Sequence, residues 1–392
     1  MVGVKEVRKE SRMRIAYFNA NLRVGQDGVT RCIYRMIDAV VERGDKAIAI
    51  GSTLPVGETP IPVYGVPSVV LPLQKNYRIA IPGYQSFAKY LQDFKPDILH
   101  VNSPCTLGFA AVKYARHFGL PVVATYHTHF PTYPRYYNLT SLEDLTWRLS
   151  RRLYNNVDRT FVPTMPILRE LDEHGMQRLK YLPNGVDTAA FNPLHRSQEW
   201  RRRFSLGEKP IVLFVSRLVW EKDLRVLAQA YAALRSKRTD FEMVIVGEGH
   251  ARRELQTIMP EAHFLGYQSG KTLTESFASA DIFVFPSTTE TFGLVTLEAM
   301  ASGLAPVAAK VGGAAEIIQE GRSGLFAEPL NGIDLAKKLE WFLDNPNHRR
   351  IIADHALARA QEYRWEFVLE KLFENYREVI EEFRRRRFPR AA

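Results

Sequence analysis

Residues 282–298 read Ile-Phe-Val-Phe-Pro-Ser-Thr-Thr-Glu-Thr-Phe-Gly-Leu-Val-Thr-Leu-Glu. The first four residues are continuously apolar, which is typical of a strand buried on both faces of a parallel sheet. A polar loop follows, and we expect a helix to begin near Gly293 and to end before Gly303. This strand–loop–helix unit predicts an α/β fold with polar residues at the carboxyl end of a buried strand.

Short apolar segments alternate with helical patterns along both halves of the chain. A helical pattern over residues 29–43, for example, stops at Gly44. The pattern predicts two doubly wound parallel-sheet domains, with sites at the carboxyl ends of their strands that face each other across a deep cleft. The expected strands are residues 14–18, 46–51, 97–101, 122–126 and 159–162 in the first half, and 211–215, 243–246, 282–285 and 306–309 in the second.

Turn-forming residues mark the boundary between the two halves. They are dense at Pro183-Asn184-Gly185-Val186-Asp187 and again at Phe191-Asn192-Pro193, so we place a hinge near residue 190. The first domain is expected over residues 13–190 and the second over residues 191–364. A long amphipathic helix from about residue 365 to residue 392 is expected to pack back on the first domain.

The composition is that of an ordinary globular protein. The 392 residues are 46% hydrophobic and 24% charged, and no apolar run approaches the ~18 residues of a membrane-spanning helix. The charged start has no apolar signal-peptide region, and two cysteines, Cys32 and Cys105, are too few for a disulfide framework. These features predict a cytoplasmic protein.

The formal net charge of +10 favours polyanionic partners such as phosphorylated substrates or an anionic membrane. Arginines cluster at residues 201–203 and at residues 384–387, where they also complement the negative end of the last helix. No nucleic-acid-binding motif accompanies the charge, so we expect no nucleic-acid partner. A basic module that binds a membrane without enzymatic activity stays open as an alternative.

Two glutamates flank the start of the predicted helix. Glu290 lies in the loop at its mouth, and Glu298 lies about two turns along it. The free N–H groups of Phe292, Gly293 and Leu294 form an anion site suited to a diphosphate. Carboxylates accept hydrogen bonds from hydroxyls, so one glutamate can hold a donor sugar and the other a ribose diol. A solvent-exposed helix face is the plainer interpretation, and the separation of the two along one helix disfavours a glycosidase pair.

Two cations follow the strand expected at residues 211–215. Arg217 and Lys222 at the carboxyl end of a central strand suit a diphosphate leaving group. The alternative is a surface pairing with Glu221 or Asp223. No Asp-x-Asp sequence occurs in the chain, so we expect fixed cations to neutralise the diphosphate without a metal or other cofactor.

Two weaker signals lie in the first half. Gly28 sits in a turn, residues 26–29, that opens the first helix and allows the backbone to approach phosphate. His127 and His129 end the strand at residues 122–126 and could orient a substrate or move a proton. Their spacing disfavours a metal site, and a structural histidine pair stays open.

In this order, the motifs resemble the retaining GT-B glycosyltransferases of family four, from the first strand to the last helix. The resemblance implies that Glu290 holds the donor sugar hydroxyls and that Glu298 binds the ribose. It also implies that Arg217 and Lys222 clamp the diphosphate.

The resemblance assigns further roles on both sides of the cleft. Gly28 would contact the phosphate from the first domain, and His127 would lie beside the reacting sugar as a catalytic group. The stretch from His263 to Tyr267 is similar to the segment whose backbone meets the nucleobase.

Residues 126–130, Tyr-His-Thr-His-Phe, and residues 133–137, Tyr-Pro-Arg-Tyr-Tyr, resemble the lipid-directed branch of the family. That branch includes GDP-mannose-dependent mannosyltransferases and sulfoquinovosyl- or glucosyl-diacylglycerol synthases. The likeness implies a glycerolipid acceptor, such as diacylglycerol or a phosphatidylinositol-type lipid, and peripheral attachment to the inner face of the cell membrane. The acceptor side would be formed by His129, Tyr133, Arg135 and Tyr136.

The function predicted in this way is metal-independent transfer of a hexose from a UDP- or GDP-linked donor with retention of anomeric configuration. Three enzymatic alternatives stay open. A soluble acceptor, such as a polysaccharide or a small glycoside, would replace the lipid. A sugar-nucleotide epimerase would need no acceptor. A phosphorylase would need a pyridoxal phosphate lysine, for which Lys310 is the candidate.

Overall fold

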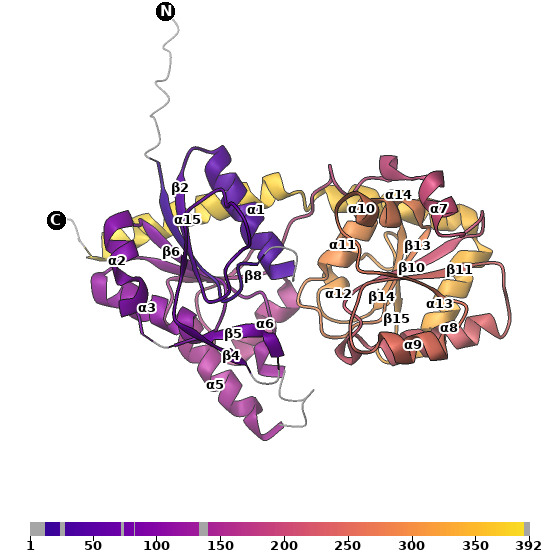
Figure 1. The fold of residues 1–392 in the computed structure, drawn as a ribbon, viewed down its shortest axis with the longest axis horizontal. Coiled ribbons are helices and arrows are strands. Elements are labelled where there is room, and N and C mark those ends of the chain that lie inside the picture. The colour runs from indigo at the N-terminus through magenta and orange to yellow at the C-terminus, as the bar shows by residue number, and fades with distance from the viewer. Residues whose placement is uncertain (1–11, 24–27, 72–73, 82, 133–139, 388–392) are drawn as a thin grey trace, which may run out of the picture.

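The computed structural model describes residues 12–23, 28–71, 74–81, 83–132 and 140–387. Two α/β domains lie next to each other, each built around a parallel sheet (Figure 1). This architecture confirms the predicted fold class. The acceptor-side residues Tyr133, Arg135 and Tyr136 lie outside the described residues.

The described sheet of the first domain has the strand order β3-β2-β1-β6-β7-β8-β9, and every pairing in it is parallel. The five strands expected from the sequence are present. The sequence does not predict β3 and β9, because three residues are too few to show a pattern. The strands are β1 (Arg14–Phe18), β2 (Lys46–Gly51), β3 (Val63–Gly65), β6 (Ile98–Val101), β7 (Val122–Thr125), β8 (Arg159–Val162) and β9 (Leu179–Tyr181).

The described sheet of the second domain has the order β12-β11-β10-β13-β14-β15 and is also parallel throughout. Its order reverses between β10 and β13, so the loops after these two strands open onto the switch point where such folds bind ligands. The strands are β10 (Ile211–Val215), β11 (Glu242–Val246), β12 (His263–Gly266), β13 (Ile282–Phe285), β14 (Ala305–Ala309) and β15 (Leu325–Ala327).

Helices cover both faces of each sheet, and the buried residues form two clusters in the first domain and one in the second. The first-domain α-helices are α1 (Gly28–Glu42), α2 (Gln85–Phe94), α3 (Thr106–Phe118), α5 (Glu143–Tyr154) and α6 (Met165–Glu173). Those of the second are α7 (Gln198–Arg203), α8 (Leu224–Arg235), α9 (Arg252–Ile258), α10 (Gly270–Ser279), α11 (Leu294–Ala301), α12 (Ala314–Ile317), α13 (Gly332–Asp344) and α14 (Pro346–Gln361). Short 3₁₀ turns are Phe130–Thr132, Thr140–Leu142, Pro193–His195 and Trp220–Lys222.

A separate antiparallel ribbon, β4 (Ser68–Leu71) with β5 (Gln74–Ala80), stands beside the first sheet. Val69 pairs with Ile79, and these two side chains are 57% and 41% exposed. The sequence does not predict the ribbon, because neither strand shows the alternation of a half-buried strand.

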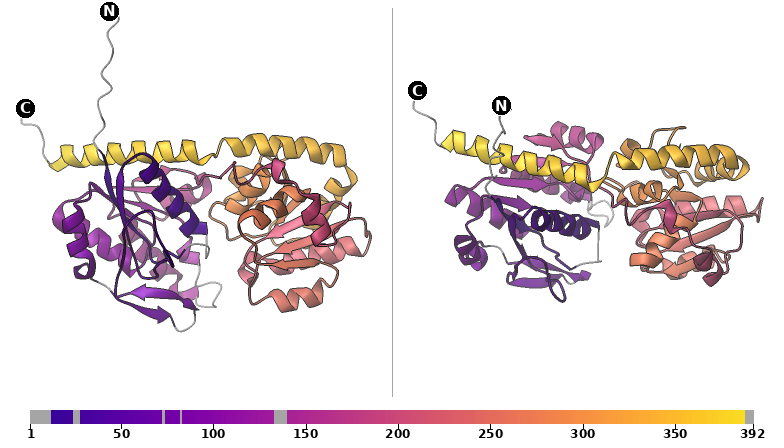
Figure 2. Two further views of the ribbon diagram at one scale, coloured as in Figure 1. Left: turned by 45° about the horizontal axis from the view of Figure 1, so that its top comes forward. Right: turned by 90° about the horizontal axis from the view of Figure 1, so that it is seen from above.

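The last helix, α15 (Trp365–Arg387), returns to the first domain as predicted. Figure 2 shows α14 and α15 running along one side of both domains. Leu372, Phe373 and Tyr376 of α15 are buried against α1 and the first sheet. The Tyr376 hydroxyl also lies 2.5 Å from Nδ1 of His100, a buried histidine of β6. Burial lowers the pKa of His100 to about 3, so the ring is neutral in this contact.

The two segments that connect the domains lie against each other. Val186 donates its N–H to the carbonyl of Tyr363 at 2.8 Å, and Trp365 donates to the carbonyl of Val186 at 3.4 Å. A Cβ on Gly185 would lie 2.5 Å from the Trp365 ring, so only glycine allows the segments to approach so closely.

Both arginine clusters, residues 201–203 and 384–387, contain an arginine that is engaged in an internal ion pair and not free to bind a polyanion. Arg201 is buried, and it binds Asp281 at 3.0 Å and the carbonyl of Ser279, so it belongs to the interior of the second domain. On α15, Arg386 pairs with Asp158 at 2.7 Å and attaches the helix end to the first domain. The prediction of two basic surface clusters is therefore wrong at Arg201, while Arg202 and Arg203 are exposed.

We expect Leu372→Ala to destabilise the protein by about 3 kcal/mol, because it leaves a cavity between α15 and the first domain. Glu370→Ala, an exposed change on the same helix, should alter stability by less than about 0.5 kcal/mol. Urea unfolding of both variants measures this, and equal midpoints would contradict the packing of α15 as a stabilising contact.

Candidate functional site

Two loops at the carboxyl ends of the central strands meet in the second domain. They are the β10 loop (residues 216–223) and the β13 loop (residues 286–293). Oδ2 of Asp223 accepts hydrogen bonds from both the N–H and the hydroxyl of Thr288, each at 2.8 Å. Asp223 therefore joins the two loops and fixes the approach of their side chains.

Lys222 reaches from the β10 loop to the β13 loop. Its ammonium forms a short ion pair with Oε1 of Glu290 and lies 3.5 Å from the Thr289 hydroxyl. The lysine is buried and Glu290 is partly exposed. Lys222 thus pairs with Glu290 and not with Glu221 or Asp223, the surface partners of the alternative interpretation.

Arg217 lies at the start of the same β10 loop and is exposed. Among the described residues its guanidinium has no side-chain hydrogen bond or ion pair. An exposed guanidinium on the loop that carries Lys222 can bind an anion with two parallel N–H groups.

The start of α11 lies next to these cations. Gly293 has φ of +86° and precedes the helix, while Phe292 is buried. The N–H groups of residues 292–294 donate no hydrogen bond to any described residue, as expected at a helix start that can accept an anion.

Gly312 and Gly313, which the sequence analysis does not identify, pack against the backbone of the β13 loop. The N–H of Gly313 donates to the carbonyl of Glu290 at 3.1 Å. A Cβ on Gly313 would lie 2.0 Å from the carbonyl oxygen of Phe292, and one on Gly312 would lie 2.4 Å from that of Glu290. The Gly-Gly sequence that follows β14 is the signal that could have indicated this close approach.

His127 of the first domain contacts the β13 loop of the second domain. It follows β7, is buried, and its carbonyl accepts a hydrogen bond from the Thr291 hydroxyl at 2.9 Å. Its Nε2 lies 3.1 Å from Oδ1 of Asn102, a buried residue directly after β6. Asn102 was not predicted as a site residue, although a polar side chain immediately after a buried strand is a usable signal.

His129 has a different environment from His127. Its ring lies 2.9 Å from the Tyr126 hydroxyl, 3.2 Å from a Glu170 carboxylate oxygen, and edge-on to Trp147. These contacts hold His129 between Tyr126, which follows β7, and the helices α5 and α6.

The first turn of α1 faces the first turns of α11. A Cβ on Gly28 would lie 3.2 Å from Leu294, and Nη1 of Arg31 binds Oε1 of Glu298 at 2.8 Å. Burial raises the pKa of Glu298, and Arg31 opposes that shift. Nothing in the sequence singles out Arg31 beyond its place three residues after Gly28.

In the segment predicted to meet the nucleobase, residues 263–267, Tyr267 lies near Arg31 and His263 does not. Tyr267 follows β12, is exposed, and is close enough to Arg31 to act on it electrostatically. His263 begins β12 and pairs with Glu242 at 3.0 Å, at the amino ends of β11 and β12. The structure therefore separates His263 from the other predicted site residues.

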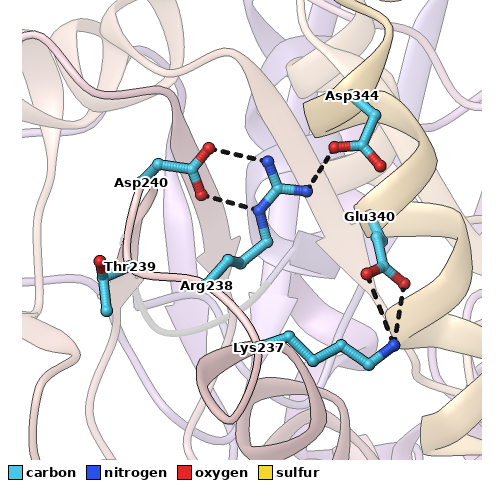
Figure 3. Close-up of a pocket in the computed structure, with 6 residues that line it drawn as sticks. All are labelled: Lys237, Arg238, Thr239, Asp240, Glu340 and Asp344. Carbon is cyan, nitrogen blue, oxygen red and sulfur yellow. Dashed lines mark hydrogen bonds and ion pairs between the residues drawn. The ribbon is translucent and has the colours of Figure 1, made fainter.

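A surface hollow elsewhere in the second domain is lined by charged residues that neutralise one another (Figure 3). Arg238 contacts Asp240 and Asp344 at 2.7 Å each, and Lys237 contacts Glu340 at 3.3 Å. The pairs with Glu340 and Asp344 join the loop after α8 to α13, so the hollow is lined by a structural ion-pair cluster.

Within the described residues, no group of three His, Cys, Asp or Glu side chains is arranged to hold a metal ion. Among these same residues, no helix is both long and apolar enough to span a bilayer.

Comparison with known proteins identifies the family. A model described as Glycosyltransferase Family 4 matches residues 26–190, and one described as Glycosyl transferases group 1 matches residues 196–359. A GDP-mannose-dependent alpha-mannosyltransferase of Corynebacterium glutamicum is 33% identical over 379 residues, which cover 94% of this chain and 89% of that protein. The chain belongs to the GT-B glycosyltransferases of family four.

Further similarities agree with this membership. The sulfoquinovosyl transferase SQD2 of Arabidopsis thaliana is 38% identical over 290 residues, 71% of this glycosyltransferase and 56% of that protein. Sucrose-phosphate synthase from Thermosynechococcus elongatus has the same fold, with a TM-score of 0.80 and 19% identity over 95% of this chain and 100% of that one. HepE of Anabaena, solved with UDP and glucose, has a TM-score of 0.74 and 20% identity over 93% and 99% of the two chains. The chain is thus a hexosyltransferase of the GT-B fold.

We expect Gly313→Ala to reduce glycosyltransferase activity at least about tenfold, because its methyl group would displace the Phe292 carbonyl and with it the β13 loop. Gly321→Ala is the control, since no atom lies within 4 Å of a Cβ added at Gly321. Gly321 has φ of +71° and Gly313 has φ of −66°, so an added methyl strains the backbone only in the control and clashes with a neighbour only at Gly313. Both variants are compared in an initial-rate assay and in thermal unfolding; equal activities would contradict the supporting role of Gly313.

Proposed function

We propose that this glycosyltransferase transfers a hexose from a UDP- or GDP-linked donor to a hydroxyl of a membrane glycerolipid, with retention and without a metal. The proposal depends most on one observation. The loop that carries Glu290, which pairs with Lys222, also holds Thr291, whose hydroxyl donates to the carbonyl of His127 in the first domain. Arg217 belongs to the same loop as Lys222, and the start of α11 directly follows Thr291 and Phe292.

The donor would be held by groups of opposite charge in adjacent positions. Arg217, Lys222 and the N–H groups at the start of α11 would bind the diphosphate. Glu290 would accept hydrogen bonds from the sugar hydroxyls and Glu298 from the ribose diol. The ion pair between Lys222 and Glu290 supports this arrangement, because it places a cation directly beside the proposed sugar-binding carboxylate.

The chemical step would be a front-side substitution at the anomeric carbon. The bond from that carbon to the diphosphate oxygen breaks, and a bond to the acceptor oxygen forms on the same face. The acceptor proton passes to the departing diphosphate oxygen, so no separate base is needed. His127 would position the sugar and support the developing charge.

Fixed cations would replace a metal in this reaction. Lys222 and Arg217 supply two positive charges at one strand end, which suits the negative charge that develops on the leaving diphosphate. The absence of an Asp-x-Asp sequence supports this assignment.

The lipid acceptor is proposed from the resemblance of residues 126–130 and 133–137 to the lipid-directed branch, and the names of the relatives agree with that branch. One is named a GDP-mannose-dependent mannosyltransferase and another a sulfoquinovosyl transferase, and both resemble this chain over most of its length. A soluble acceptor and a sugar-nucleotide epimerase are the alternatives. An epimerase would convert the nucleotide sugar without acceptor, which a chromatogram of the nucleotides detects.

Helix α5 supplies a surface suited to a membrane. Leu145, Arg148, Leu149 and Arg152 have helical spacing and are all exposed, and the two leucines are 42% and 45% exposed. Apolar side chains interleaved with arginines are typical of a helix that lies in the interface of an anionic bilayer. We infer that this face attaches the enzyme peripherally to the inner face of the cell membrane.

We expect Lys222→Ala to lower turnover about 100-fold or more, because the leaving diphosphate loses a fixed cation. Lys271→Ala, an exposed lysine of the same domain, should remain active. UDP- and GDP-linked glucose and mannose are supplied with diacylglycerol or phosphatidylinositol vesicles, with and without EDTA, and proton NMR reads the product's anomeric configuration. Full activity of a folded Lys222→Ala enzyme would contradict the diphosphate assignment, and loss of activity in EDTA would contradict metal independence.

Flotation with anionic vesicles should show binding that falls as salt rises. Two double variants should each weaken vesicle binding several-fold. One combines Leu145→Ser with Leu149→Ser, and the other combines Arg148→Gln with Arg152→Gln. Ile351→Ser and the pair Arg202→Gln with Arg203→Gln, exposed positions of the second domain, are the controls. If the controls weaken flotation as much as the α5 variants do, α5 is not the attachment face.

A further inference from the structure

The two glutamates of the site obtain their cations from different domains. Glu290 is paired with Lys222, which belongs to the same domain. Glu298 is paired with Arg31, which belongs to α1 of the first domain, at 2.8 Å. The carboxylate that is proposed to bind ribose is thus the one that depends on the opposite domain.

This contact differs from an ordinary surface ion pair. The Glu298 side chain is only 9% exposed, whereas that of Arg31 is 45% exposed, so the arginine enters from the solvent side to a carboxylate inside the protein. A buried carboxylate without a partner is strongly disfavoured in its charged form. The partner is therefore needed for the charge of Glu298, and it comes from outside the domain to which Glu298 belongs.

The geometry leaves Glu298 able to bind a second group. Arg31 contacts Oε1, and an ionised carboxylate has two oxygens with several acceptor positions. A ribose hydroxyl can therefore be accepted while the arginine remains in place. Arg31 would then fix the orientation of the carboxylate that the hydroxyl meets.

We propose that Arg31 is a positioning residue for the nucleotide, which holds the Glu298 carboxylate charged and oriented from across the domain interface. Nucleotide binding by the second domain is then coupled to contact with the first domain. The inference rests on the ribose role proposed for Glu298.

Glu298 and Arg31 each act on the pKa of the other. Burial raises the pKa of Glu298, and Arg31 is the group that lowers it. Glu298 in turn raises the pKa of Arg31, with smaller contributions from Cys32 and Tyr267. Removal of Arg31 therefore leaves burial unopposed, so the pKa of Glu298 rises further and the carboxylate takes up a proton at higher pH.

The test measures the affinity of GDP and of UDP by calorimetry at several pH values between about pH 8 and about pH 5.5, and compares the pH at which affinity falls in each variant. The variants are Arg31→Met, Arg31→Lys, Glu298→Gln and the double change of Arg31→Met with Glu298→Gln. Arg35→Met is the matched control, because Arg35 lies on the same helix but pairs with Glu42 and Glu366.

We expect Arg31→Met to weaken nucleotide binding about tenfold or more at the upper pH, and to weaken it further as the pH falls. The acidic loss of affinity should lie at higher pH in Arg31→Met than in the wild type. Arg31→Lys should restore part of the affinity and most of the pH profile, since it keeps the charge. Arg35→Met should bind as the wild type does.

The Glu298→Gln variant separates the two assignments. If it binds nucleotide as tightly as the wild type, the ribose role of Glu298 is wrong and the inference fails with it. If it weakens binding but Arg31→Met changes neither affinity nor pH profile, only the role of Arg31 is wrong. If Arg31→Met weakens binding equally with and without Glu298, the arginine contacts the nucleotide itself, and its proposed action through Glu298 is overturned.

Discussion

The hydrogen bond from the Thr291 hydroxyl to the carbonyl of His127 joins loops that follow central strands of two separate sheets. It is possible only because the carboxyl ends of both sheets point toward each other. The contacts of Gly28 with Leu294 and of Arg31 with Glu298 depend on the same orientation. Facing strand ends are therefore the constraint that places residues from both halves of the chain in one site.

Charge compensation decides how the side chains of this site are arranged. Glu290 and Glu298 are each paired with one cation through Oε1, so the second oxygen of each carboxylate can still accept a hydrogen bond. The loop that carries Glu290 is held from one side by Asp223 and from the other by Gly313. Pre-positioned charges in a fixed loop suit a reaction in which a diphosphate leaves with its bonding electrons.

The predictable part of the fold follows from local patterns. Strands such as Ile282–Phe285 are continuous apolar runs, and their ends are visible as turn residues in the chain. The ribbon of β4 with β5 and the short edge strands lack such a pattern and are missed. In the sequence Arg201 belongs to a basic cluster, but in the structure it is buried and paired with Asp281. His263 and Tyr267 are close in sequence, yet His263 begins β12 and Tyr267 follows it, so the two lie at opposite ends of that strand.

The sequence by itself determines the α/β fold class, the two-domain division of the pattern and the residue types at the strand ends, because these depend on periodicity and short-range spacing. Only the tertiary structure decides which charges meet. Arg31 and Glu298 are separated by 267 positions, and Lys222 and Glu290 by 68. No local pattern relates such residues, since their contact arises from the order of the strands and from the return of α15 to the first domain.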